Sequence, residues 1–268
     1  MTTQTFPLTG PINLRVRLGH GSLTVTTADD LTEASVSLTP REATSDAAAR
    51  IEVAMNGPTL EVKQPRKGGL ADLIGKWRHE RDAVDAEITI PSGTALDLTT
   101  YTADITVRGR SGGADVTTGS AAIALGHVDG DVRLRGGRSN CRIDRVTGSA
   151  VARSGAGSVS FGEVGGSVQA DFGSGDVEIG TARGSVRSRS GSGNARFDAV
   201  YGDVDFATGA GQVSIGLPSG VAAQLDVQTG SGEVVSELPI DDRRTGTGTS
   251  IKVRARIGSG DVRLFRAA

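Results

Sequence analysis

Glycine recurs with a period of 18 residues through the middle of this chain. Two series of glycines keep this step: Gly130, Gly148, Gly166, Gly184, Gly202 and Gly220, and then Gly137, Gly155, Gly173, Gly191 and Gly209. Large apolar residues keep the same register, in a column that runs Leu125, Ile143, Phe161, Ile179, Phe197 and Ile215. A fixed period of this length is typical of stacked repeats, in which each unit buries its apolar residues only against its neighbours.

Each 18-residue unit divides into two nine-residue halves that both contain a short β pattern. In one unit these are Val132–Leu134 and Cys141–Ile143, with apolar residues at alternate positions. Alternation points one side of each strand inward, and glycines at the corners supply backbone conformations closed to other residues. The sequence therefore predicts an all-β fold: a parallel β-solenoid over residues 94–268, with two strands per 18-residue coil.

The regular repeats cover residues 112–220, after which the glycine spacing changes. Gly209 to Gly230 is 21 residues and Gly230 to Gly258 is 28. We expect residues 221–268 to form a C-terminal cap, with strands at 251–257 and 262–264 closing the far end. Solenoids need such caps because an open coil end is an unpaired strand edge.

The first 93 residues alternate apolar and polar positions without the 18-residue period. Residues 12–18 and 23–25 flank a turn at 19–21, which predicts a hairpin, and Asn56-Gly57-Pro58 marks another turn. We expect residues 1–93 to form an antiparallel, sandwich-like β unit that precedes the solenoid.

Residues 66–82 interrupt this unit with a basic segment. Leu70, Leu73, Ile74 and Trp77 have helical spacing, and Lys76 and Arg78 lie beside Trp77. One hypothesis is an amphipathic helix that contacts a membrane surface or a partner. The alternative is an excursion whose apolar face packs on the protein itself. This alternative is favoured because the apolar face of so short a helix is too small to bind lipid alone.

The composition excludes several classes of function. Aromatic residues are 3% of the chain and the formal net charge is −2, so there is no bulk attraction to nucleic acid or to an anionic membrane. The single cysteine cannot form an internal disulfide and is compatible with a reducing compartment. No signal peptide and no apolar run of about 18 residues is recognisable. The sequence predicts a cytoplasmic protein.

An arginine-rich stretch is the strongest electrostatic feature. It contains six arginines and one acid, Asp144, between residues 133 and 153: Arg133, Arg135, Arg138, Arg142, Arg145 and Arg153. On a regular solenoid these would form a basic patch, so we predict them, with Lys76, Trp77 and Arg78, as partner-binding residues. No aromatic residues interleave to stack on bases, which argues against nucleic acid.

No pattern in the chain predicts a catalytic residue, a metal site or a cofactor. At the position equivalent to Asp176 in each half-coil, serine and asparagine outnumber aspartate, so side-chain turns to the backbone are expected rather than calcium cages. Outward carboxylates mix with arginines, as on a solvated face: Asp171, Asp176, Glu178, Asp198, Asp203 and Asp205. The histidines are scattered, and Cys141 occupies an inward column, where a buried, inert thiol is expected.

The whole chain resembles a bacterial family of β-strand-repeat proteins of unknown function whose members are called "putative adhesins". The resemblance is carried by the motif at residues 18–25, by Gly-Ser-Gly-Asp/Asn units such as Gly173–Val177 and Gly191–Ala195, by residues 217–223 and by residues 253–262. It implies the repeat architecture and supplies no catalytic or binding residue.

These observations favour a non-enzymatic, adhesin-like interaction scaffold whose partners are proteins. Two alternatives stay open. One is a carbohydrate-binding or carbohydrate-active protein, which would need a groove with two carboxylates about 5–10 Å apart. The other is membrane-surface binding, related to envelope stress, through residues 66–82.

Overall fold

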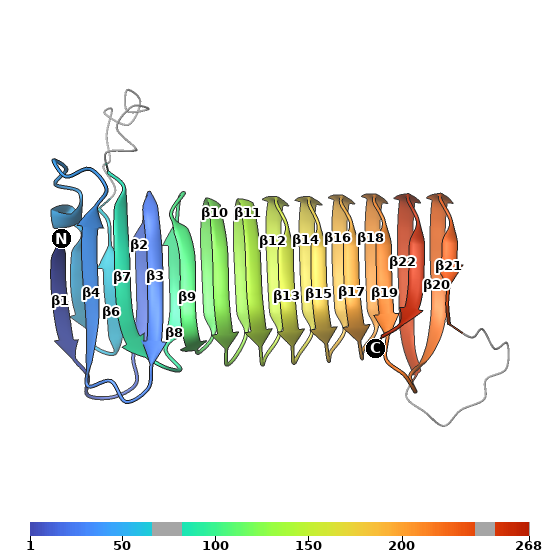
Figure 1. Cartoon of the computed structure of the whole chain (residues 1–268), viewed down its shortest axis with the longest axis horizontal. Helices are drawn as coiled ribbons and strands as arrows, with labels where there is room; N and C mark the ends of the chain where they lie inside the picture. The colour runs from blue at the N-terminus through green and yellow to red at the C-terminus, as the bar shows by residue number, and fades with distance from the viewer. Residues whose placement is uncertain (66–81, 239–249, 268) are drawn as a thin grey trace. The chain divides into compact units, whose positions relative to one another are not determined.

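A computed structural model describes residues 1–65, 82–238 and 250–267. The chain divides into two compact units, Met1–Ser139 and Asn140–Ala268. Most of the described residues lie in strands that stack side by side within each unit (Figure 1). The basic segment 66–82 lies outside the described residues except for Asp82.

The first unit contains ten complete strands, one short 3₁₀ helix and the start of β11. The elements are β1 (Thr2–Pro7), β2 (Asn13–Leu18), β3 (Gly21–Ala28), β4 (Glu33–Pro40), η1 (Ala48–Arg50), β5 (Glu52–Asn56), β6 (Thr59–Lys63), β7 (Val84–Pro91), β8 (Ala95–Thr100), β9 (Asp104–Ser111), β10 (Ala114–Val128) and β11 (Val132–Val146). Antiparallel pairs join β1 to β4, β4 to β7 and β5 to β6. The turn at Asn56-Gly57-Pro58 therefore connects a hairpin, as its sequence predicts.

The hairpin expected at residues 12–25 is wrong. β2 lies between β6 and β8 and pairs with both in parallel, while β3 lies between β7 and β9, again in parallel. A strand has only two edges, so β2 and β3 cannot also pair with each other. The segment 19–21 is thus a solenoid corner. The alternation of apolar and polar residues around it fits a hairpin and a solenoid corner equally well, so the sequence pattern does not distinguish them.

The expected fold class is confirmed: parallel solenoid coils, with antiparallel pairs among the N-terminal strands. Parallel pairing begins at Asn13, well before the expected start of the solenoid at residue 94. The expected division of the chain into two domains, residues 1–93 and 94–268, stays a prediction.

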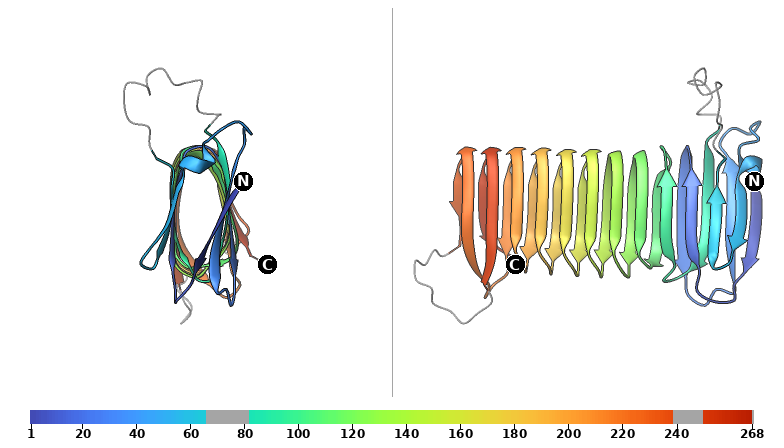
Figure 2. Two further views of the ribbon diagram at one scale, coloured as in Figure 1. Left: turned by 90° about the vertical axis from the view of Figure 1, so that its left-hand side faces the viewer. Right: turned by 180° about the vertical axis from the view of Figure 1, so that it is seen from behind.

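The second unit is built from coils of two strands each. Beyond β11 its strands are β12 (Ala150–Ala156), β13 (Val159–Val164), β14 (Val168–Ser174), β15 (Val177–Ala182), β16 (Val186–Ser192), β17 (Ala195–Val200), β18 (Val204–Ala210), β19 (Val213–Leu217), β20 (Ala222–Ser231), β21 (Val234–Ser236), β22 (Ser250–Ser259) and β23 (Val262–Arg266). Equivalent strands pair in parallel and in register, so that Val159 is paired with Val177 and Val177 with Ala195. The first and second strands of the coils form two layers (Figure 2).

The last coil of the chain does not close the second unit, which corrects the expectation for residues 251–264. β22 lies between β18 and β20, and β23 lies between β19 and β21. The terminal coil is therefore β20–β21, where Val234 and Val235 are exposed. The spacing from Gly209 to Gly230 is three residues longer than the repeat. These extra residues let the chain skip one coil position after β18 and β19, and β22 later fills that position. A step between strands is about 4.8 Å, and three extended residues span about 10 Å.

The core between the two layers is narrow and fills with alternating large and small residues. Phe161 and Phe197 are fully buried in the second strands, while Ala152, Ala170 and Ser188 are buried in the first strands. Phe206 breaks this alternation, and its ring meets Phe197 edge to face with a centroid separation of 6.0 Å. Such a pair adds to the stability gained from burial.

The glycine series have two different physical causes. In the series through Gly173 and Gly191, a Cβ on Gly191 would lie 2.5 Å from the Gly173 carbonyl oxygen, so the close approach of successive coils requires glycine. A further series two residues on has positive φ, as at Gly193 (φ +132°). The conformational role that we expect at the corners thus belongs to this further series and not to the one at Gly173.

Candidate binding site

The predicted arginine stretch falls partly in each unit, and acidic neighbours compensate most of it. In the first unit, Arg133 lies 3.9 Å from Asp131 and Arg135 lies 3.1 Å from Asp115. Arg138 is exposed and has no ion pair among the residues that the structure describes.

The other three arginines of the stretch are paired in the second unit. Arg142 contacts Asp144 (3.2 Å), Arg145 contacts Glu163 (2.7 Å) and Arg153 contacts Asp171 (3.5 Å). Exposed pairs of this kind contribute little to stability, but they cancel the positive charge that an anionic partner would meet. The partner-binding role of these arginines stays a prediction, as does that of Lys76, Trp77 and Arg78, which lie outside the described residues.

The polar residues at one corner bind the backbone of the next coil. Asn140 Oδ1 accepts the N–H of Ser158, Asp176 Oδ1 accepts the N–H of Asn194, and Asn194 Oδ1 accepts the N–H of Gln212. These oxygens replace a missing backbone acceptor at each step. They face the backbone and not a shared cavity, and no cluster of three or more metal-ligating side chains occurs among the described residues.

Cys141 is buried, as its column predicts. Desolvation raises the pKa of its thiol to about 12, because a buried thiolate loses its hydration. The nucleophilic form is therefore suppressed at neutral pH.

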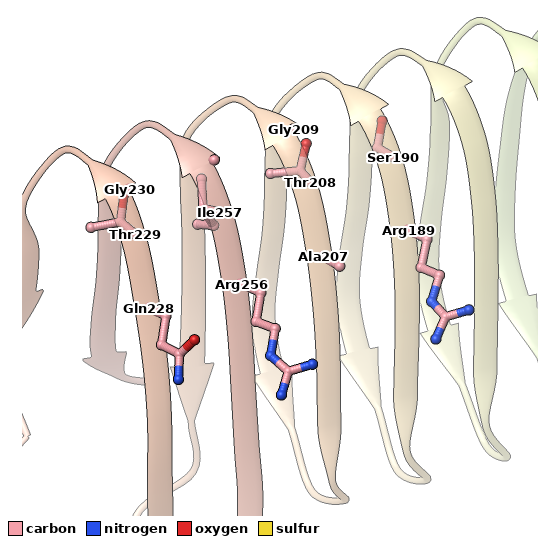
Figure 3. A pocket seen from close by; sticks show the side chains of 11 residues that line it. Arg189, Ser190, Ala207, Thr208, Gly209, Gln228, Thr229, Gly230, Arg256 and Ile257 are labelled. Carbon is pink, nitrogen blue, oxygen red and sulfur yellow. The ribbon is translucent and has the colours of Figure 1, made fainter.

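An open depression of about 620 Å³ lies on the first layer of the second unit. It crosses four neighbouring strands in the spatial order β16, β18, β22 and β20, and its rim residues are Arg189, Ala207, Arg256 and Gln228 (Figure 3). Corner glycines such as Gly209 and Gly258 complete the lining. We call this feature the arginine depression.

Arg189 and Arg256 stand out because they lack partners. They are the two arginines in the described part of the second unit that have neither an ion pair nor a hydrogen bond. Ala207 lies between them in register, and Figure 3 shows both guanidinium groups on the same side of the layer. An exposed guanidinium without a partner is available to a carboxylate or another anion.

The charges next to the depression cancel one another. Two residues earlier on the same strands, Arg187 pairs with Asp205 (3.9 Å) and Arg254 pairs with Asp226 (3.1 Å). Asp171, the register neighbour of Arg189, is engaged by Arg153 and by the Gln169 amide. Among the described residues that line the depression, the excess charge therefore comes from Arg189 and Arg256.

The arginine depression is not predicted from the sequence, and the reason is topological. Stepping 18 residues from Arg189 reaches Ala207, but the next strand in space carries Arg256 rather than Gln228. The signal in the sequence for this strand order is the glycine spacing after Gly209, which is three residues longer than the repeat and marks the coil position that β22 fills.

Comparison with known proteins agrees with the fold. The model of the family described as Toastrack DUF4097 matches residues 14–264. The chain belongs to the Toastrack DUF4097 family. The family match covers nearly the whole chain, which confirms the resemblance inferred from the repeat motifs.

Solved structures that resemble this Toastrack chain carry names that point to adhesion. A "putative adhesin" from Parabacteroides distasonis is 13% identical with a TM-score of 0.53, over 98% of this chain and 96% of that one. A "putative adhesin" from Bacteroides fragilis is 15% identical with a TM-score of 0.47, over 98% and 96%. At this identity the first likeness supports the fold alone. No curated protein sequence matches the chain.

No helix among the described residues is both long enough and apolar enough to span a membrane.

Proposed function

We propose that this Toastrack chain is a non-enzymatic scaffold that binds a macromolecular partner through the arginine depression. The observation that carries the proposal is the pair Arg189 and Arg256, two unpartnered guanidinium groups on strands whose preceding arginines, Arg187 and Arg254, are ion-paired. Solenoids offer extended, regular surfaces to partners, and one solved structure of similar fold has the name "putative adhesin". The proposal places the scaffold in the cytoplasm, where a lone cysteine stays reduced.

The lining of the depression supports binding rather than chemistry. No carboxylate, histidine or cysteine is among the described residues that line it, so this lining lacks the pair of acids that glycoside hydrolysis requires. The carboxylates beside it on the same strands are engaged: Asp205 contacts Arg187 (3.9 Å), and Asp226 contacts Arg254 (3.1 Å).

A comparison of two double variants tests the proposal. The full chain, its R189Q/R256Q variant and its R187Q/R254Q variant are immobilised, and proteins retained from native lysate are quantified by mass spectrometry. Both variants remove two positive charges from the same two strands. We expect partners that bind the wild type and R187Q/R254Q and are lost with R189Q/R256Q. The proposal fails if no retained protein depends on Arg189 and Arg256.

A further inference from the structure

We propose that the arginine depression recognises an extended acidic segment of a partner protein, with two carboxylates three residues apart. This inference rests on the proposed function and names the kind of partner. In it, one carboxylate binds Arg189, the other binds Arg256, and the segment runs across the strands.

The spacing of the two arginines selects the conformation of the segment. Arg189 pairs in register with Ala207, and Ala207 with Arg256. Two strand steps amount to about 9.6 Å. A polyproline II segment rises about 3.1 Å per residue with three residues per turn, so residues i and i+3 project on one side about 9.3 Å apart. A β-strand matches less well, since its same-side residues recur at about 6.7 Å.

The chemistry of the two arginines favours carboxylates. A guanidinium presents paired N–H groups that match both oxygens of a carboxylate. Neither group must first break an internal ion pair, because neither Arg189 nor Arg256 has one in the described part of the chain. Ala207 between them and Gln228 beside Arg256 are uncharged and do not repel an acidic chain. Asp171, beside Arg189, is already engaged by Arg153.

The shape of the depression leaves room for a backbone. Ala207 has only a methyl group between the two arginines, and Gly209 and Gly230 have no side chain at the corner above them (Figure 3). Gln228, on the next strand, donates from Nε2 to Asp226 Oδ1 (3.4 Å), which leaves its Oε1 to accept an N–H of the segment. The lining residues that the structure describes include no aromatic side chain, so they lack the stacking platform that single-stranded nucleic acid uses.

Peptide binding to the full chain tests this inference. The probes are two fluorescent, proline-rich peptides of equal composition and charge: one has glutamates at positions i and i+3, the other at i and i+1. Binding is measured by fluorescence anisotropy at low ionic strength, where exposed charges are least screened. We expect the i, i+3 peptide to bind about tenfold more tightly, because only it can reach both guanidinium groups.

Single variants show whether the two arginines act as inferred. R189Q and R256Q should each weaken the i, i+3 peptide about tenfold and bring it to the level of the i, i+1 peptide. The matched controls are R187Q and R254Q, which remove the same charge from the same strands, and these should change its affinity less than about twofold.

Three results would overturn the inference: equal affinity for the two peptides, equal losses in the control variants, or tighter arginine-dependent binding of inorganic polyphosphate than of the i, i+3 peptide. If the i, i+3 peptide does not bind but a lysate protein still depends on Arg189 and Arg256, the acidic segment is wrong and the proposed function stands. If no lysate protein depends on them, the proposed function itself fails.

Discussion

Val204 is paired in register with Val253, and Leu225, which is much nearer in the sequence, lies on the far side of Val253. The coil β22–β23 is thus inserted between two coils that precede it in the chain. The same exchange of order occurs in the first unit, where β2 and β3 lie between later strands. Because strand order decides which outward side chains become neighbours, the insertion also creates the arginine depression.

Engineered disulfides can test this strand order on the surface of the depression. Ala207 and Arg256 are direct register partners, about 4.8 Å apart, within the Cα separation that a disulfide tolerates. The A207C/R256C variant should therefore form a disulfide under mild oxidation, detectable by peptide mapping without reductant. The native Cys141 is buried and should not compete.

The matched control for that crosslink is A207C/Q228C. Gln228 is two strand steps from Ala207, about 9.6 Å away, which is too far for a disulfide. If A207C/Q228C were oxidised as readily as A207C/R256C, the inserted position of β22 would be contradicted.

The repeat region shows how far the sequence leads. The columns through Val159 and Phe161 predict both the strands and their register, because side chains that stack on their own equivalents must recur at one period. The same reasoning fails where the chain leaves the 18-residue period. Inserted strands such as β2 and β22 still alternate apolar and polar residues, so their pattern does not show which strands they pair with. Arg256 was missed for this reason: its neighbours depend on strand order, which local pattern does not encode.

A buried serine offers a stabilising substitution. Ser188 is fully buried, and its hydroxyl has no hydrogen-bond partner among the described residues. The equivalent positions in two earlier coils are Ala152 and Ala170, so a methyl group fits this column. Removing an unsatisfied hydroxyl should raise the free energy of unfolding of S188A by about 1 kcal/mol, measured by urea denaturation.

Ser190 provides the control on the same strand. Its Oγ donates a hydrogen bond to the Ser192 carbonyl oxygen at 2.8 Å. S190A should therefore lower the free energy of unfolding by about 0.5–1 kcal/mol. A stability loss in S188A as large as that in S190A would show that the Ser188 hydroxyl has a partner in solution.

The corner glycines should tolerate substitution very unequally. Gly193 has φ +132°, and a Cβ there would lie 2.1 Å from the Gly175 carbonyl oxygen. G193A combines backbone strain with this clash, so we expect a loss of more than about 3 kcal/mol, seen as a lower midpoint of chemical denaturation. Gly220 also has positive φ (+81°) but faces open space, so G220A should cost only about 1–2 kcal/mol. Equal losses would mean that the stacked coils move apart to accommodate a side chain.

The buried thiol makes stability depend on alkaline pH. Burial raises the pKa of Cys141 from 9.0 to about 12, so the unfolded chain releases this proton at a lower pH than the folded chain does. Between these values the folded state binds more protons, and its stability falls as pH rises, by at most about 1.4 kcal/mol per pH unit.

The C141V variant removes this group, and Val159, the register partner of Cys141, shows that valine fits the column. We expect the free energy of unfolding of the wild type to fall relative to that of C141V between pH 9 and pH 11, in urea titrations at each pH. Parallel curves for the two proteins, or rapid labelling of native Cys141 by a thiol reagent at pH 8, would contradict the burial of this side chain.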